Sequence, residues 1–163
     1  MTSNRRVVMI DTTPSAETAV YKRLGKGITT FTPSNGGKIE QKQYINQVYA
    51  NTTRNGMQKQ WAFSGDKITD DDAITFVLSL SEKIGDDAKT TIVIFDLLDG
   101  EDEPVAATAY TAKRYNVVVD VTNDGSLEGG NDAGIDGTIY VNGDPTEGTF
   151  TPGTGTFTEA VAA

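Results

Sequence analysis

The side chains that could carry chemistry in this sequence are carboxylates, because its 163 residues include 23 Asp and Glu but no histidine and no cysteine. Without histidine the chain lacks the commonest general base near neutral pH and the commonest metal ligand. Without cysteine it lacks thiol nucleophiles, thiolate ligands and disulfides. Catalysis would therefore have to use lysine, tyrosine or paired carboxylates, as in a glycosidase whose two acids lie about 5–9 Å apart.

Acidic residues cluster at three places, and each place has a simpler explanation than an ion site. Residues 70–72 (DDD) precede an apolar helical pattern and suit a helix start. Residues 120–125 begin like a calcium loop, but position twelve is Asn131 where a bidentate Glu is required. Within residues 96–103, an acidic cluster in a predicted turn is formed by Asp96, Asp99, Asp102 and Glu103, and a calcium site in these loops stays open as an alternative. We predict that the chain is not an enzyme and assign no catalytic residue, metal or cofactor.

Motifs for other ligands are also missing from the sequence. No glycine-rich phosphate loop and no G-x-S-x-G is present, and the basic residues lack the dense, aromatic-interleaved pattern of a nucleic-acid reader. No apolar run approaches the roughly 20 residues that span a bilayer, and residues 1–22 do not resemble a secretion signal. These absences favour a protein that acts by binding other macromolecules, with no membrane partner.

The elements that would position these residues are mostly strands. Threonine and glycine are abundant and turn signals recur at short intervals, which is typical of an all-β sandwich or barrel. Residues 90–98 (TTIVIFDLL) form a continuous apolar run that predicts a central strand buried on both faces. Residues 115–121 alternate as in a half-buried strand, and residues 137–142 predict another. Residues 148–163 indicate an extended tail anchored by Phe150 and Phe157.

One helix is predicted over residues 70–84. Thr69 and Asp72 have the spacing of a capping box, and an apolar stripe at helical spacing follows. Lys83 and Gly85 suit the carboxyl end of such a helix. We expect the helix to pack against a sheet.

A long polar hairpin is predicted over residues 38–63, with Asn55-Gly56 as a turn signal. Residues 38–50 mix glutamine and aliphatic side chains on both faces, so a short helix is an alternative there. Isolated two-stranded hairpins are marginally stable in water, so a protruding one needs a partner surface. Trp61 and Phe63 are expected in the core at its base. Tyrosine and methionine are enriched in the cores of protein interfaces. We therefore predict that Tyr44, Tyr49 and Met57 lie in an interface.

Charge is distributed unevenly along the chain. Residues 1–60 have nine basic and three acidic side chains, whereas residues 61–163 have five basic and twenty acidic ones, for a total of −9. One interpretation is that acidic loops and a basic segment are simply solvated. The other is that the basic surface of one copy meets the acidic surface of the next, in a head-to-tail contact that builds rings or filaments.

The order of these features resembles the major tail tube proteins of long-tailed, siphovirus-like bacteriophages. The resemblance is carried by residues 60–85 (QWAFSGDKITDDDAITFVLSLSEKIG), the strand at 90–98 and residues 137–160 (GTIYVNGDPTEGTFTPGTGTFTEA). In order of elements it spans residues 28–160. It implies a mainly β fold in which two packed sheets form a sandwich, flanked by one helix, with a protruding hairpin and extended termini.

The resemblance further implies a structural virion protein that self-assembles into stacked, hexameric rings forming a tail tube. The expected partners are other copies of the chain and the tape-measure, tail-terminator and baseplate proteins. DNA would pass through an acidic channel without specific binding, because a basic lining would hold its phosphates. The location implied is the tail of the virion, assembled in the host cytoplasm.

By the same resemblance the chain is one domain over residues 1–163. It would comprise an amino-terminal arm (1–27), the sandwich with its hairpin (28–147) and a carboxyl-terminal tail (148–163). Contacts between subunits are expected on the hairpin and both termini, at Arg5, Arg6, Lys42, Tyr44, Tyr49, Arg54, Met57, Phe150 and Phe157.

Two other functions fit a β-sandwich with this composition. One is an immunoglobulin-like adhesion or carbohydrate-binding module, in which exposed aromatic residues such as Trp61 and Tyr49 would stack on sugar rings. The other is a capsid decoration or head–tail joining protein.

Overall fold

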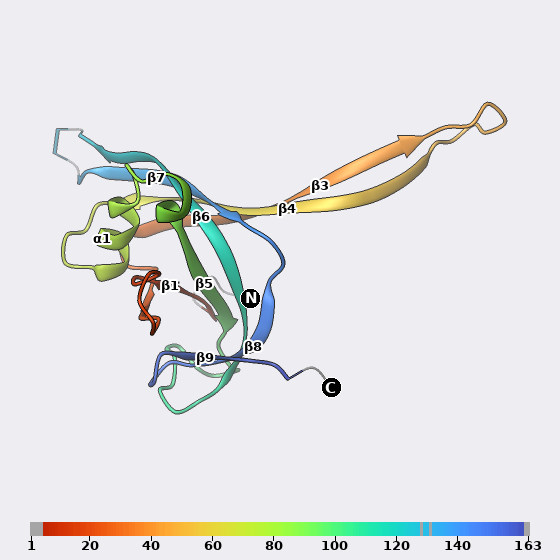
Figure 1. Ribbon diagram of the computed structural model, residues 1–163. Coiled ribbons are helices and arrows are strands. Elements are labelled where there is room, and N and C mark those ends of the chain that lie inside the picture. The colour runs from red at the N-terminus through yellow and green to blue at the C-terminus, as the bar shows by residue number, and fades with distance from the viewer. Residues whose placement is uncertain (1–4, 128, 131, 162–163) are drawn as a thin grey trace.

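The structure is a computed structural model that describes residues 5–127, 129–130 and 132–161 (Figure 1). Within these residues it is mainly β with a single α-helix, as predicted. The strands are β1 (Arg6–Asp11), β2 (Tyr21–Arg23), β3 (Ile28–Lys42), β4 (Asn51–Asp66), β5 (Lys89–Asp96), β6 (Tyr110–Ser126), β7 (Gly134–Val141), β8 (Thr146–Thr151) and β9 (Thr156–Glu159). The α-helix is α1 (Asp72–Ser79), and a 3-10 helix, η2 (Gly85–Ala88), follows it.

All strands belong to one antiparallel, hydrogen-bonded sheet, where two separate packed sheets were expected. The strand order is β2-β1-β5-β6-β7-β4-β3, and β8 pairs with β6 and β9. The connection is β6, whose residues 110–114 pair with β8 and whose residues 117–126 pair with β7. Figure 1 shows the result: β3, β4 and β7 lie at one end of β6, and β8 and β9 lie at the other.

The central strand β5 is buried on both faces, which confirms the interpretation of its continuous apolar run. Ile92 and Ile94 face a core that includes α1, and Val93 and Phe95 face a second core that includes Phe150. Successive side chains of a strand point to opposite faces, so a strand with a core on each side must be apolar throughout. Burying each such aliphatic side chain contributes about 1.5–3 kcal/mol.

The helix is shorter than predicted and is capped by a different residue. Asp71 is the N-cap, and its carboxylate accepts hydrogen bonds from the backbone N–H groups of Ala73 and Ile74. The helix ends at Ser79, because the N–H groups of Leu80 and Ser81 bond to carbonyls three residues back and tighten the last turn. The predicted end at residue 84 is therefore wrong.

The described segments nearest the two chain ends belong to the sheet, where an extended arm and tail were expected. Residues 6–11 form β1, which pairs with β5 and buries Val7 and Ile10. Residues 146–159 form a β8–β9 hairpin whose Phe150 pairs with Tyr110 across β6 and is fully buried. A two-strand hairpin with a buried aromatic residue cannot act as a free tail.

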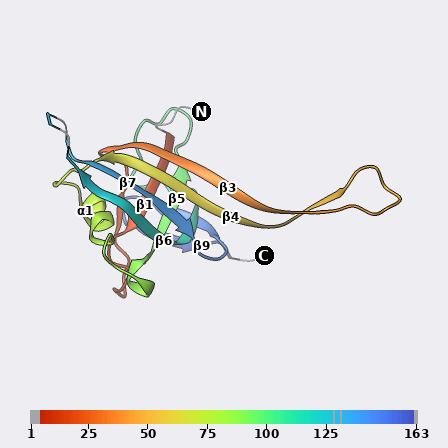
Figure 2. The same ribbon diagram turned by 90° about the horizontal axis from the view of Figure 1, so that it is seen from above.

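The predicted protruding hairpin is present, and it is longer than expected. Strands β3 and β4 pair from Ile28 to Lys42, so residues 38–42 are strand and not helix, and residues 43–50 make the turn. We call residues 33–60 the arm. Figures 1 and 2 show the arm extending far beyond the rest of the sheet. Asn55 lies in β4 at a bulge between pairs Lys38–Gly56 and Ile39–Arg54, and the Asn55-Gly56 turn prediction is therefore wrong.

Candidate assembly surface

The base of the arm is fixed to the body by an aromatic cluster around Trp61, as predicted for a core residue. The Trp61 ring is stacked on Phe31 at a centroid distance of 6.0 Å and meets Tyr115 edge-on at 5.1 Å. The ammonium group of Lys59 lies 5.4 Å from the Trp61 centroid. Such contacts add about 0.5–1.5 kcal/mol each beyond the burial of apolar area. Beyond this cluster the arm leaves the body.

Beyond its base the arm exposes apolar side chains that none of the described residues covers. Tyr49 and Val48 are each 85% exposed. A two-stranded ribbon has no second layer, so both of its faces are open to solvent. Contiguous exposed apolar surface marks binding sites more often than it marks solvated surface. The large exposed apolar residues of the arm are Ile39, Tyr44, Ile45, Val48, Tyr49 and Met57.

The turn at the end of the arm has an ordered structure of its own. The side-chain amide of Gln43 donates to the carbonyl oxygens of Gln47 and Val48, at 3.0 and 3.1 Å. The ammonium group of Lys42 lies 5.2 Å from the centroid of the Tyr44 ring. The glutamine-rich composition of this segment, which made its strand assignment ambiguous, therefore serves to hold the turn.

The arm is positively charged. It contains four basic residues and one acid, Glu40, which gives a net charge of +3 and leaves −12 on the rest of the chain, whose total is −9. Glu40 accepts a hydrogen bond from the amide of Asn55. Among the described residues no acid lies within 4.0 Å of the arm cations Lys38, Lys42, Arg54 and Lys59.

The other basic residues of the first sixty are paired within the chain, so the charge separation along the sequence is partly cancelled in space. Arg5 and Arg6 bind Asp99 and Asp96, which belong to the acidic cluster of residues 96–103. The hydrogen bonds that Arg6 donates to the Asp96 carboxylate raise the pKa of Arg6, so this guanidinium stays charged. The remaining pairs are Lys22–Asp72, Arg23–Glu103 and Lys26–Asp70.

The expected interface residues therefore fall into two groups. The arm brings together five of them, all on one ribbon: Lys42, Tyr44, Tyr49, Arg54 and Met57. The other four are elsewhere on the body. Phe150 has no exposed surface and belongs to the second core, so its assignment to a subunit contact is withdrawn. Phe157 is half-buried beneath the guanidinium of Arg114, at 4.9 Å from the ring centroid.

Asp11 is the one buried carboxylate among the described residues, and it accepts hydrogen bonds from the N–H groups of Thr13 and Val20, which fixes the loop after β1. No group of three acids is placed to hold a metal ion in this part of the chain. Within the same residues, no helix is long and apolar enough to span a membrane.

Sequence gave no match in two comparisons: neither a protein-family model nor a curated protein is similar to this chain. Solved structures do match. One is a chain from the tail of an empty GTA particle determined with C6 symmetry, with a TM-score of 0.58 and 8% identity over 90% of this chain and 98% of that one. Another is a chain from the PVC sheath-tube complex of an extracellular contractile injection system in its extended state. Its TM-score is 0.52 and its identity 10%, over 91% of both chains.

The chain therefore has the fold of components of tail and sheath-tube assemblies. The predicted resemblance to phage tail tube proteins is confirmed at the level of fold. Because nearly the whole of each neighbour is covered, the shared part includes the sheet and not one motif alone.

Proposed function

We propose that this chain is a structural subunit of a phage-like tail tube, which assembles with copies of itself into stacked rings and has no catalytic role. The observation that carries the proposal is the arm, a charged ribbon whose exposed apolar residues are left uncovered by the part of the chain that the structure describes. The likeness to a chain from a tail with C6 symmetry supports six subunits per ring.

The contact between rings is placed on the arm. Apolar residues near its end supply the area, and Lys42 and Arg54 supply charge that attracts an acidic neighbour. Arg5, Arg6 and Phe157 are secondary candidates for contacts within a ring, because part of each side chain remains exposed.

An acidic body suits the passage of DNA through such a tube. The chain outside the arm carries a charge of −12, and a lining of that sign repels phosphates where a basic lining would bind them through counterion release. In this role the chain would be located in the tail of the virion after assembly in the host cytoplasm, with tape-measure, terminator and baseplate proteins at the ends of the tube.

Charge reversal on the arm tests the proposal. The double variant Lys42→Glu/Arg54→Glu is expected to weaken self-association at least about tenfold while the fold is kept, because both residues are exposed and attract an acidic surface. Sedimentation velocity over a concentration series measures the association. The emission of Trp61, the one tryptophan, reports whether the base of the arm stays packed.

A matched control is Lys67→Glu/Lys113→Glu, which makes the same change in net charge away from the arm. The control is expected to associate like the unmodified chain. Equal association of all three proteins would remove the arm from the mechanism.

A further inference from the structure

An open cleft of about 920 Å³ lies between the loop after β1, the carboxyl end of α1 and η2. Phe76 of α1 and Leu80, which follows the last residue of α1, form part of its wall, together with Asp86 and Asp87 of η2. Clefts of about 300–1,000 Å³ are the size that proteins use to enclose small ligands or anchoring side chains. Because Asp11 is satisfied by backbone N–H groups of its own loop, the cleft has an ordered wall before anything binds.

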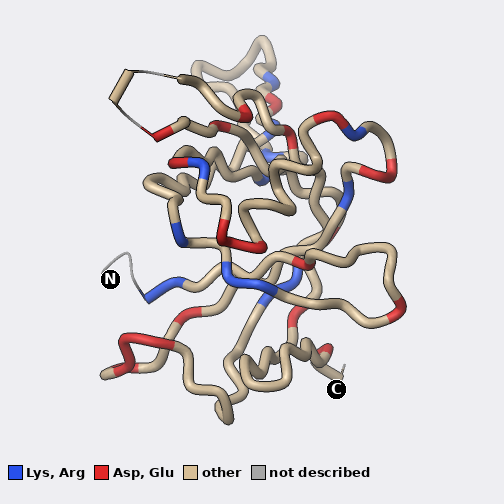
Figure 3. The backbone as a smooth tube through the Cα atoms, turned by 90° about the vertical axis from the view of Figure 1, so that its left-hand side faces the viewer, with Lys and Arg blue, Asp and Glu red and all other residues tan. Residues whose placement is uncertain are grey.

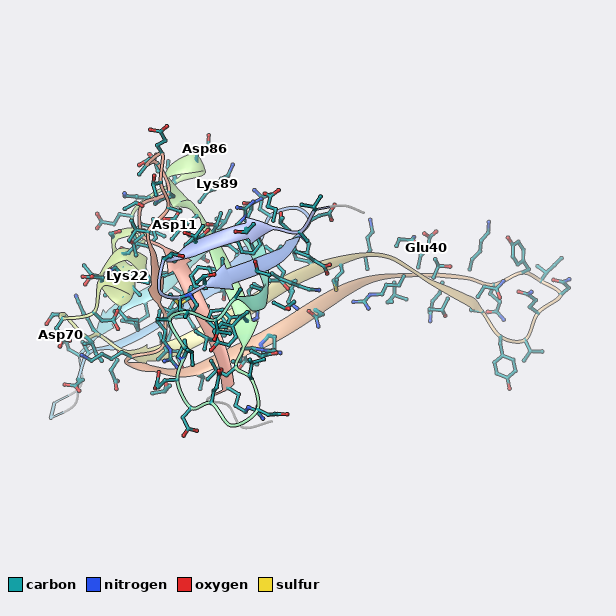
Figure 4. All side chains as sticks on the ribbon, turned by 90° about the horizontal axis from the view of Figure 1, so that it is seen from below. Asp11, Lys22, Glu40, Asp70, Asp86 and Lys89 are labelled. Atoms are coloured by element: carbon teal, nitrogen blue, oxygen red, sulfur yellow. The ribbon has the colours of Figure 1, made fainter. Side chains whose placement is uncertain are left out.

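The cleft and the arm lie on opposite sides of the molecule. Figure 4 shows Asp11, Asp86 and Lys89 on the body, at a distance from Glu40 on the arm. Figure 1 shows the arm pointing away from the end that carries α1. When two different surfaces at opposite ends of one molecule bind each other, the contact is head-to-tail and each copy offers a free site to the next.

The charges of the two surfaces are complementary. The charged residues that line the cleft are Asp11, Asp86, Asp87, Lys83 and Lys89, a net charge of −1, and the arm carries +3. Figure 3 looks at this end of the molecule and shows its loops carrying many acidic residues. Lys89 is already bound to Asp86, whereas Asp87 is exposed and has no ion pair among the described residues.

The apolar parts also match. Ile84, between α1 and η2, is 86% exposed and stands beside residues that border the cleft. The turn of the arm offers Tyr44, Ile45, Val48 and Tyr49, which is more exposed apolar surface than any other turn described. Interface contacts of this kind combine aromatic anchors with a charged rim.

We propose that the turn of the arm, residues 43–50, docks in this cleft of a second copy of the chain. The inference rests on the proposed function and adds the receiving surface to it. Each arm strand continues about ten residues past Trp61, and at about 3.3 Å per residue the turn lies roughly 30 Å from the base. The arm is therefore long enough to leave its own body and reach the next subunit.

Disulfide trapping tests the docking directly, because the unmodified chain has no cysteine. Protein with Val48→Cys at the turn is mixed with protein carrying Ser79→Cys, an exposed position that borders the cleft. The control mixture replaces the second protein with Thr158→Cys, exposed on β9 at the other end of β6. After mild oxidation, we expect the heterodimer to form several-fold faster with Ser79→Cys than with Thr158→Cys.

Charge exchange provides the second measurement and guards against a cysteine that disturbs packing. Asp86→Lys/Asp87→Lys is expected to weaken association when it is mixed with the unmodified chain. Combining it in one chain with Lys42→Glu/Arg54→Glu should restore association, because the contact again joins opposite charges. Rescue by the combined variant supports docking in the cleft, and additive loss contradicts it.

The two proposals fail in different ways. If the unmodified chain assembles but its turn cross-links equally with both partners or more with Thr158→Cys, the cleft is not the receiving surface and the tube proposal stands. If the unmodified chain never associates at any concentration, the proposed function and the docking that depends on it are both wrong.

Discussion

Tyr110 illustrates how one buried hydroxyl can fix a long loop. Its O–H donates to Glu101 at 2.7 Å and accepts from the backbone N–H of Val105 at 2.8 Å. Both partners lie in the loop between β5 and β6, and Arg5 and Arg23 bind two further acids of that loop. The acidic cluster that the sequence offers as a calcium candidate is therefore held by cations and a tyrosine of the same chain.

We expect Tyr110→Phe to lower the free energy of unfolding by about 1–2 kcal/mol, because the Glu101 carboxylate and the Val105 N–H group both lose their hydrogen bond to the Tyr110 hydroxyl. Urea denaturation measures the change. The control is Tyr140→Phe, since that ring is partly exposed and its hydroxyl has no hydrogen bond among the described residues. A loss of similar size in both variants would mean that the loop is not held by this hydroxyl.

The same residue predicts a pH dependence. Burial raises the pKa of the Tyr110 hydroxyl above its ordinary value of 10.0. The folded state thus favours the neutral phenol, and this stabilisation is complete below about pH 10 and is lost as pH rises through the raised pKa. The stability difference between the unmodified chain and Tyr110→Phe should therefore shrink only as pH rises above about 10. A constant difference would contradict the assignment.

Single residues were predictable from sequence when their neighbours in the chain determined their environment. Trp61 and Phe63 lie in a strand with clear alternation, and both are buried as predicted. Phe150 could not be placed in this way, because the strand that covers it, β6, is joined to β8 only through β7 and a turn. Its burial depends on long-range pairing that residue patterns do not encode.

At the scale of elements, the start of α1 is where the predicted capping residue differs from the observed one. The sequence predicts a capping box of Thr69 and Asp72, and the structure has Asp71 as the N-cap. Asp71→Ala is expected to cost about 1 kcal/mol, since it leaves the N–H groups of Ala73 and Ile74 unpaired. Thr69→Ala, which a capping box would predict to be harmful, should be nearly neutral because Thr69 is exposed and precedes the cap. If urea denaturation shows that both variants lower the free energy of unfolding equally, Thr69 contributes to the cap and the assignment of Asp71 alone is contradicted.

A second element test concerns the pairing of β4 with β7, which carries the arm. Gly137 lies opposite Phe63, and a Cβ at residue 137 would stand 2.5 Å from that ring and 2.6 Å from the carbonyl oxygen of Asp120. Gly137→Ala is therefore expected to destabilise the fold by about 1–3 kcal/mol. Gly129→Ala is the control, because its Cβ would meet open space. Equal midpoints in thermal unfolding would contradict the close packing.

Elements were predictable where a long pattern existed and were missed where the strand was short. The continuous run of β5 and the alternation of β6 gave both strands from sequence. Strands β2 and β9 have three and four residues, and nothing in so short a segment separates a strand from a loop. The turn of the arm was misplaced because Asn55-Gly56 suits a bulge as well as a hairpin.

At the scale of the whole molecule, the structure combines a body with two cores and a basic arm that has no cover. The sequence predicted a protruding hairpin and a mainly β fold, but one curved sheet with strands at both termini could not be derived from local patterns. It also could not show that ion pairs within the chain neutralise most of the amino-terminal cations, which leaves the arm as the basic surface available to a neighbour.

The proposed function depends on this basic, partly apolar arm binding other copies of the same chain. Negative-stain electron microscopy of the purified chain at high concentration tests it most directly, beside a variant in which residues 38–56 are replaced by a two-residue turn. We expect rings or tubes for the full chain and at most single rings or monomers for the shortened one. Full-length protein that stays monomeric under every condition, or tubes that form equally well without the arm, would contradict it.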